Sequence, residues 1–365
     1  MKLLHTADWH LGKTLKGQSL IYDQKFIINE IFDIIDDQKP DAILISGDIF
    51  DRSVPPPDAV DLFNDTLNRF AEKNLPALII AGNHDSATRL NFGSKLFAKQ
   101  NIFIAAKIAE NPAQIILEDN FGEIYFSLIP FFVQSEIQTK FSCEDDANKF
   151  YVDLARKNIP ANKRSVALAH VFITGGIESE SERKFVGGSE NIDANIFANY
   201  NYVALGHLHR PQSISNAIRY AGSPLKYSFD EANHKKSVTI AEIDGAGAVK
   251  TDKIPLIPRR DVKIFKGTLA ELRKKPRTQD YICAQLTEHA INIQDKLADI
   301  FPNLLKVEFL TAKSLNMDDE AREFREGGST LDYFADFFKS QTGEDLKAEY
   351  REAMGKFLSG MWKED

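Results

Sequence analysis

The chain has 365 residues, of which 43% are hydrophobic and 27% charged, proportions typical of a soluble globular protein with two or three domains. No run of about 18 apolar residues is present, which excludes a membrane-spanning helix. Two cysteines, Cys143 and Cys283, exclude a disulfide framework and fit a reducing cytosol. The formal net charge of -8 argues against a strongly basic nucleic-acid binder, although a local basic face can still bind DNA.

The first 230 residues alternate between short apolar runs, which predict strands, and apolar stripes at helical spacing, which predict helices. The predicted strands are Lys2–Thr6, Ala42–Ser46, Leu78–Ala81, Ser165–Ala169 and Tyr202–Leu205. The predicted helices are Gln24–Gln38 and the stretch after Pro55–Pro57, for which Asp58 is the expected N-cap. This strand-helix-strand alternation predicts a mainly parallel sheet.

A cluster of polar side chains follows each predicted strand. In order, the clusters are Asp8-Trp9-His10, Gly47-Asp48, Gly82-Asn83-His84-Asp85, His170 and Gly206-His207-Leu208-His209. In open α/β sheets, sites form outside the carboxyl ends of the strands, so all five clusters are expected at one edge of the sheet. The glycines allow sharp exits from the strands and a close approach of the backbone.

The residue types in these clusters predict a metal centre. Carboxylate oxygen, amide oxygen and imidazole nitrogen together suit a mid-range divalent ion. Such a set indicates two metal ions about 3.5–4 Å apart and hydrolysis of a phosphoester. Asp48 is the natural bridging ligand because it follows the middle one of the first three strands. His207 and His209 would point oppositely in an ideal strand, but in a turn they can reach different metals.

The pattern changes to strands after residue 214. The expected strands are Ile218–Ala221, Ser237–Ile243 and Thr251–Ile254, with a hairpin turn at Asp244–Gly247. Pro255 and Pro258 mark a boundary, so we expect a catalytic domain at 1–257 and a small α+β domain at 258–315. Residues 318–365 carry apolar stripes at 331–338 and 346–358, which predict two amphipathic helices.

The first three motifs and Gly206-His207-x-His209 together match the signature of the calcineurin-like metallophosphoesterases. Within that family, His5–Gly12 and Ala221–Phe229 resemble the SbcD branch, the bacterial relatives of the eukaryotic double-strand-break repair nuclease. The resemblance covers almost the whole chain and is looser in residues 260–320. It implies an α/β fold built as a layered β-sandwich flanked by helices. It also implies that 258–315 caps the site and recognises DNA.

The resemblance further implies two Mn²⁺ ions, with Mg²⁺ as the other candidate. One ion would take Asp8, His10, Asp48 and His209, and the other Asp48, Asn83, His170 and His207. A water activated by the ions would attack the phosphorus. His84 would face the phosphate and stabilise or protonate the leaving group, and Asp51 is the candidate that orients His84. Asp85 is open to the same role or to that of a loop carboxylate.

The activity implied by the resemblance is that of a DNA exonuclease or endonuclease, the catalytic subunit of an ATP-dependent complex that processes DNA ends and hairpins in repair and recombination. The implied partners are DNA, an SbcC-type ATPase that uses the ATP, and a second copy of the chain. Together they would form a cytoplasmic, nucleoid-associated heterotetramer without a membrane. The C-terminal helices at 318–365 would bind the ATPase, and helices at 58–73 and 90–99 would form the dimer contact. A candidate DNA-facing rim comprises Lys13, Lys16, Arg52, Arg89, Arg210 and Lys226.

Two other functions fit parts of the pattern. A phosphomonoesterase or protein phosphatase of the same fold would explain Gly47-Asp48-x-x-Asp51-Arg52, but Ser53 replaces the final glycine of that pattern and Asp85 replaces its glutamate. A non-catalytic scaffold would lack a metal ligand, and none of the expected ligands is missing. The Gly222-Ser223-Pro224 segment and the C-terminal extension favour the nuclease.

Overall fold

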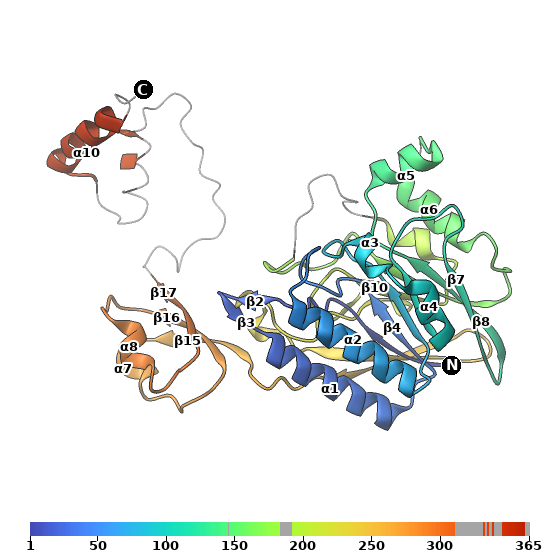
Figure 1. Cartoon of the computed structure of the whole chain (residues 1–365). Coiled ribbons are helices and arrows are strands. Elements are labelled where there is room, and N and C mark those ends of the chain that lie inside the picture. The colour runs from blue at the N-terminus through green and yellow to red at the C-terminus, as the bar shows by residue number, and fades with distance from the viewer. Residues whose placement is uncertain are drawn as a thin grey trace. The chain divides into compact units, whose positions relative to one another are not determined.

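The computed structural model describes residues 1–144, 146–182, 192–310, 331–332, 334–335, 338 and 345–361. The chain divides into two compact units, Met1–Leu310 and Thr311–Asp365, each of which is described by itself (Figure 1). None of the helices in these described ranges is long and apolar enough to cross a bilayer. In the second unit, α10 spans Ala348–Met361, where the second C-terminal helix is expected. Of the first expected C-terminal helix, the described residues 331–332, 334–335 and 338 are helical, and residues 333, 336 and 337 lie outside the described residues.

The body of the first unit contains two six-stranded sheets. The first has the order β14-β13-β1-β4-β5-β6, with strands Val249–Pro255, Ser237–Ile243, Lys2–Thr6, Ala42–Ser46, Ala77–Ile80 and Ile102–Ala105. The second has the order β11-β12-β10-β9-β8-β7, with strands Gln212–Ser213, Ile218–Tyr220, Tyr202–Gly206, Arg164–His170, Gly122–Ile129 and Gln114–Asp119. A separate ribbon pairs β2 (Thr14–Leu15) with β3 (Gln18–Ser19).

The layered sandwich implied by the resemblance is confirmed. The strands that lead to the clusters pair in parallel, as expected, but they belong to two sheets instead of one. Alternation along the chain does not reveal that the β7–β8 hairpin begins a new sheet instead of extending the first. One shared core lies between the sheets, where Leu44 and Leu78 of the first pack with Val166 and Leu168 of the second. Burying each such side chain contributes about 1.5–3 kcal/mol.

Helices cover the outer faces of both sheets (Figure 1). On the first sheet lie α1 (Ile21–Gln38) and α2 (Pro57–Glu72), and on the second lie α5 (Gln134–Phe141) and α6 (Ala147–Arg156). Every residue of β4 is buried because one face meets the helices and the other meets the second sheet. This double burial explains why the strand reads as a continuous apolar run.

Two helix boundaries differ from the prediction. The N-cap of α2 is Pro56, and Asp58 lies in the first turn, where its carboxylate faces the positive end of the helix dipole. Proline fits the first helical position because that position needs no N–H donor, and Pro57 occupies it. The helix expected at 90–99 is broken by Gly93, whose φ is 74°. Short pieces replace it: α3 (Ala87–Leu90), α4 (Ser94–Phe97) and the turn Ala98–Gln100.

A small α/β unit follows the body. Its parallel sheet has the order β15-β16-β17, with strands Val262–Gly267, Tyr281–Leu286 and Leu304–Phe309. The short helices α7 (Leu269–Leu272) and α8 (Ile293–Leu297) pack on it, and Ile282, Leu286 and Phe301 contribute to a core of its own. Residues 311–315 of the domain expected here lie outside the described residues.

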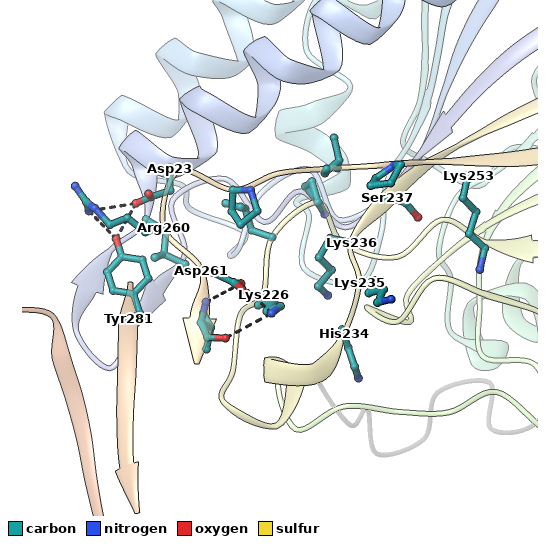
Figure 2. A pocket seen from close by; sticks show the side chains of 17 residues that line it. Asp23, Lys226, His234, Lys235, Lys236, Ser237, Lys253, Arg260, Asp261 and Tyr281 are labelled. Carbon is teal, nitrogen blue, oxygen red and sulfur yellow. Dashed lines mark hydrogen bonds and ion pairs between the residues drawn. The ribbon is translucent and has the colours of Figure 1, made fainter. Parts of the chain in front are cut away.

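The small unit meets the body at a cavity of about 370 Å³ (Figure 2). Two sets of polar contacts cross this junction. Asp23 of α1 accepts a hydrogen bond of 2.7 Å from the hydroxyl of Tyr281, and Arg260 lies 3.5 Å from the same carboxylate. The Lys226 ammonium lies 2.8 Å from the Asp261 carboxylate. These contacts hold the small unit beside the segment that leads from β12 to β13.

Candidate metal centre

The five polar clusters meet at the edge where both sheets end. Three contacts join residues that are far apart along the chain. His10 Nε2 lies 3.0 Å from His209 Nε2, and His170 Nε2 lies 2.9 Å from Asn83 Oδ1. The backbone N–H of His207 donates to Asp8 Oδ1 over 2.9 Å. Parallel pairing of β1 with β4, of β4 with β5 and of β9 with β10 brings the carboxyl ends of these strands together.

The backbone at this edge adopts a sparsely populated conformation. Asp8, His10, Asp48 and His207 have φ values of 56°, 44°, 50° and 103°, which non-glycine residues rarely adopt. Hydrogen bonds between neighbouring loops hold it, since the N–H of Asp8 donates to Gly47 O and that of His10 to Asp48 O, each over 3.0 Å. Strain of this kind gathers at functional sites because the surrounding structure must maintain it.

Three glycines make room for the polar side chains, as the sequence predicts. A Cβ on Gly47 would lie 2.3 Å from His170 Nδ1, and one on Gly82 would lie 2.1 Å from Asp48 Oδ1. A Cβ on Gly206 would lie 1.9 Å from the carbonyl oxygen of Ser46. No real side chain tolerates such distances, so the ligand-type groups pack directly against main chain.

Asp48 lies between the two halves of the centre. Its Oδ2 is 3.5 Å from His10 Nε2 and 3.5 Å from His170 Nε2. Two groups in the described residues have the geometry to hold an ion, and both contain Asp48: one adds His10 and His84, the other adds Asp8 and His170. A carboxylate in this position can bridge two ions. Which ion Asp8 would serve, and whether His84 would be a ligand at all, stay predictions.

The electrostatics of the centre suit cations. Burial raises the pKa of Asp8 well above its usual range. Burial also disfavours a charged His170, but the carboxylates of Asp48 and Asp8 outweigh it and raise the pKa of this histidine to about 9. A proton on His170 thus supplies positive charge beside Asp48, whose pKa stays well below its usual range despite burial because of His170. A metal ion would supply it better, because it contacts several of these groups at once.

Neutral imidazoles and unpaired atoms complete the fit to metal ions. Burial lowers the pKa values of His10 and His209, so both rings are neutral and can direct lone pairs to an ion. Burial lowers the pKa of His207 to about 3. Among the described residues, Asp8 Oδ2, His10 Nδ1 and Asn83 Nδ2 are buried without a hydrogen-bond partner. The residues present therefore fit divalent ions.

His84 is held from two sides. Its N–H donates to Asp48 Oδ1 over 2.9 Å, and its ring Nδ1 donates to the backbone carbonyl oxygen of Asp51 over 2.7 Å. Its Nε2 lies 4.0 Å from Asp48 Oδ2. The carboxylate of Asp51 accepts a hydrogen bond of 2.8 Å from Lys13. The contact from Asp51 to His84 is thus made by the main chain.

Asp85 has a structural position. Its carboxylate accepts hydrogen bonds from the backbone N–H groups of Gly82, Ile49 and Phe50 at 2.9, 3.1 and 2.9 Å. These bonds join the loop after β5 to the loop after β4, and so hold Asn83 beside Asp48. Burial raises the pKa of Asp85 to about 7, even though the three backbone donors favour its charged form.

Sequence reasoning missed a buried polar layer beneath His209. Glu231 is fully buried, and its Oε1 lies 3.3 Å from His209 Nδ1. Lys236 donates to Glu231 and, over 2.8 Å, to the carbonyl oxygen of His209. Glu182 Oε1 accepts from the N–H of His209 over 2.5 Å. Glu231 lies in the short 3-10 helix Asp230–Asn233, and Glu182 and Lys236 lie outside helices and strands, so no periodic pattern marks these residues. The one available signal was that Glu231 follows closely on the Ala221–Phe229 segment.

The side chains of the candidate DNA-facing rim fall into two groups, those bound to other residues and those exposed without such a contact among the described residues. Lys13 and Lys226 are bound to Asp51 and Asp261, each over 2.8 Å. Arg89 is exposed and donates to the carbonyl oxygen of Ser53 over 2.9 Å. The remaining candidates are exposed on the surface: Lys16, Arg52 and Arg210.

Comparison with known proteins gives consistent matches. The model of the family described as calcineurin-like phosphoesterase matches residues 1–211. SbcD of the nuclease SbcCD from Staphylococcus epidermidis is 31% identical over 373 residues, covering 98% of this chain and 98% of that protein. The SbcD protein from Staphylococcus saprophyticus is 33% identical over 383 residues, covering 100% of this chain and 99% of that protein.

Proposed function

Because the chain belongs to the calcineurin-like phosphoesterase family and to its SbcD branch, we propose that it is a metal-dependent DNA nuclease. The reaction is hydrolysis of phosphodiester bonds. The observation that carries the proposal is the meeting of carboxylate, amide and imidazole groups around Asp48, in a chain that matches nuclease subunits along its whole length.

The proposed metal ligands are those implied by the signature. Asp8, His10, Asp48 and His209 serve one ion, and Asp48, Asn83, His170 and His207 serve the other. The position of Asp48 between His10 and His170 supports its role as the bridge. Mixed oxygen and nitrogen ligands suit Mn²⁺, which we take as the ion, with Mg²⁺ as the second candidate. Two such ions supply Lewis-acid charge at the phosphate and an activated water.

The remaining chemistry belongs to the protein's own residues. His84 donates through Nδ1 to the Asp51 carbonyl oxygen, which fixes the plane of the ring. Its Nε2, at the metal centre, holds or gives a proton to the leaving oxygen. Asp51 acts on His84 through this carbonyl. Asp85 keeps the loops of Asn83 and Asp48 in register through its three backbone contacts.

The proposed partners follow from the names of the relatives, which are subunits of a complex called SbcCD. This chain works with an SbcC-type ATPase, which uses the ATP, on the ends and hairpins of DNA during repair and recombination. The complex is a heterotetramer with two copies of this chain, in the cytoplasm and associated with the nucleoid. The exposed side chains of Phe92 and Leu96 support a dimer contact at the predicted place.

The proposed domains are a nuclease domain at 1–257, a capping domain that recognises DNA at 258–315, and ATPase-binding helices at 318–365. The separate core of the small unit supports the second of these, and the division of the chain after Leu310 supports the third. A phosphatase function is not favoured. Both full-length relatives carry the nuclease name. Asp85 stands where the phosphatase pattern has a glutamate, and its carboxylate accepts a hydrogen bond from the backbone N–H of Gly82.

One assay tests the proposal. The metal-free chain is supplied with Mn²⁺ and given duplex DNA, hairpin DNA and para-nitrophenyl phosphate esters, with and without the ATPase. We expect manganese-dependent shortening of DNA, faster on duplex ends when the ATPase and ATP are present, and none by an Asp48→Ala variant. Rapid hydrolysis of a phosphomonoester without any cleavage of DNA would overturn the proposal in favour of a phosphatase.

A further inference from the structure

A buried ion pair lies directly beneath His209. Glu231 is 0% and Lys236 is 5% exposed, and the Lys236 ammonium is hydrogen-bonded to the Glu231 carboxylate. The same ammonium donates to the carbonyl oxygen of His209 over 2.8 Å and to the hydroxyl of Ser223 over 2.7 Å. The pair thus holds both the ring and the main chain of one proposed metal ligand.

The hydrogen bonds around Glu231 define the tautomer of His209. Glu231 Oε1 lies 3.3 Å from His209 Nδ1, and the hydroxyl of Ser181 lies 2.6 Å from the same nitrogen. Ser181 donates its single hydroxyl proton to Glu231, so it accepts at His209. Both routes end on a carboxylate, which only accepts. Nδ1 therefore carries the proton, and the lone pair of His209 is on Nε2, which lies 3.0 Å from His10 Nε2.

Stability alone does not account for this pair. Removing two charges from water costs several kcal/mol per ion, and apolar residues of similar size often stabilise a core as well or better. A carboxylate that orients a metal-bound histidine contributes to metal binding instead of to stability. It fixes the tautomer and the ring plane and makes the ring a better donor to the ion.

We propose that Glu231, charge-balanced by Lys236, is a positioning residue that holds His209 with Nε2 directed into the metal centre. The inference rests on the proposed function, because it takes His209 as a ligand. It goes further in assigning a role to two residues outside the metal signature. It also links the centre to the junction with the small unit, since Lys236 lines the cavity there (Figure 2).

Paired substitutions avoid leaving a single buried charge. In Glu231→Leu/Lys236→Met both charges and the carboxylate acceptor for His209 are gone, and Ser181 loses the carboxylate to which it donates. In Glu231→Gln/Lys236→Met the charges are gone but a neutral acceptor of similar volume is kept. Asp261→Asn is the matched control, because its pair with Lys226 lines the same cavity and does not contact His209 (Figure 2).

Calorimetric titration of the three full-length, metal-free variants with Mn²⁺ gives the primary measurement. We expect the leucine variant to weaken one of two sites by about 10–100-fold. The glutamine variant should recover part of that loss, and the control should match the wild type. A purely structural role predicts equal effects of leucine and glutamine, because their volumes are similar.

Three results would overturn the inference: wild-type affinity at both sites in the leucine variant, equal weakening by leucine and glutamine, or failure of both double variants to fold. The last would make the pair a core element. Metal titration needs no DNA cleavage. A chain that binds two ions in this Glu231-dependent way but cuts no DNA would contradict the proposed nuclease function and leave the positioning role standing.

Discussion

The ring Nδ1 of His84 donates a hydrogen bond of 2.7 Å to the backbone carbonyl oxygen of Asp51. A carbonyl oxygen only accepts, so the proton at Nδ1 is fixed and chemistry at this ring must use Nε2. Because the contact comes from the main chain, replacing the side chain of Asp51 leaves it in place. The Asp51 carboxylate instead meets Lys13. Replacing His84 and replacing the side chain of Asp51 should therefore have different effects on the rate of catalysis.

The His84→Ala variant should keep two bound ions and lose about 10²–10⁴-fold in the rate of DNA cleavage, the usual contribution of a positioned proton donor. Asp51→Asn should cost much less, because the carbonyl remains. Rates measured with saturating Mn²⁺ test this. The control is His289→Ala, since His289 stacks on Phe309 in the small unit. Cleavage by His84→Ala at the wild-type rate would remove His84 from the mechanism.

Replacing Asp48 with alanine should weaken both metal sites, whereas replacing Asp8 should weaken one. The reason is that Asp48 Oδ2 lies 3.5 Å from a histidine of each half of the centre. Calorimetric titration with Mn²⁺ measures the number of sites and their affinities. Asp41→Ala is the control, because Asp41 binds the N–H of Lys2 far from the clusters. Two intact sites in the Asp48 variant would refute the bridge.

The Asp119→Asn variant should be less stable by about 1–3 kcal/mol at pH 7, because it loses a charged hydrogen bond. Arg164 Nη2 donates to Asp119 Oδ1 over 2.6 Å and Nη1 to Oδ2 over 2.9 Å, which joins the end of β7 to the start of β9. Hydrogen bonding from Arg164 holds the pKa of Asp119 well below its usual value of 3.8. A depressed folded-state pKa contributes stability above pH 3.8 that is lost as the pH falls further.

Urea unfolding of the wild type and the Asp119 variant at pH 7 and pH 3 tests this direction of the pH dependence of stability. The difference in unfolding free energy should shrink at the lower pH. Asp252→Asn serves as the control, because the side chain of Asp252 is 63% exposed and its ion pair with Lys250 contributes little to stability. An equal difference at both pH values would show that charge is not the cause.

Removing residues 318–365 should separate nuclease chemistry from coupling to the ATPase. All proposed ligands lie in the unit Met1–Leu310, so the truncated chain should bind metal and cut short single-stranded DNA. The apolar stripe of the C-terminal helix fits a helix-on-coil contact. Pull-down of the ATPase and ATP-stimulated cutting of duplex ends should both be lost. Unchanged pull-down, or loss of metal binding, would contradict this.

The active unit should be a dimer that depends on the exposed apolar side chains near α3 and α4. Phe92 is 84% and Leu96 is 67% exposed, more than a monomer needs to leave in water. Phe92→Glu/Leu96→Glu should give a monomer by light scattering at micromolar concentration, whereas Ile116→Glu, on β7, should not. A wild-type chain that is monomeric even with the ATPase would rule out this contact.

The positions of the ligand clusters could be predicted because each follows a buried strand. A strand covered on both faces, such as β4, is apolar throughout and is therefore easily recognised in the sequence. The residue that follows it, Gly47, must be a glycine because a Cβ there would collide with His170. The division into two sheets could not be predicted from alternation, since β7 and β8 look like any other strands. Nor could the roles of Glu231 and Lys236, because those depend on which loops meet in space.

The place of β1 in its sheet also bears on how the protein is made. The strand that leads to Asp8 lies between β4 and β13, so one of its two neighbours comes from residues 237–243. A nascent chain that has left the ribosome only as far as residue 200 lacks that neighbour and the late histidines. Long-range pairing of this kind forms late. An unfinished translation product of this length therefore carries the first four clusters but cannot complete the sheet that holds Asp8, nor place His207 and His209 beside them.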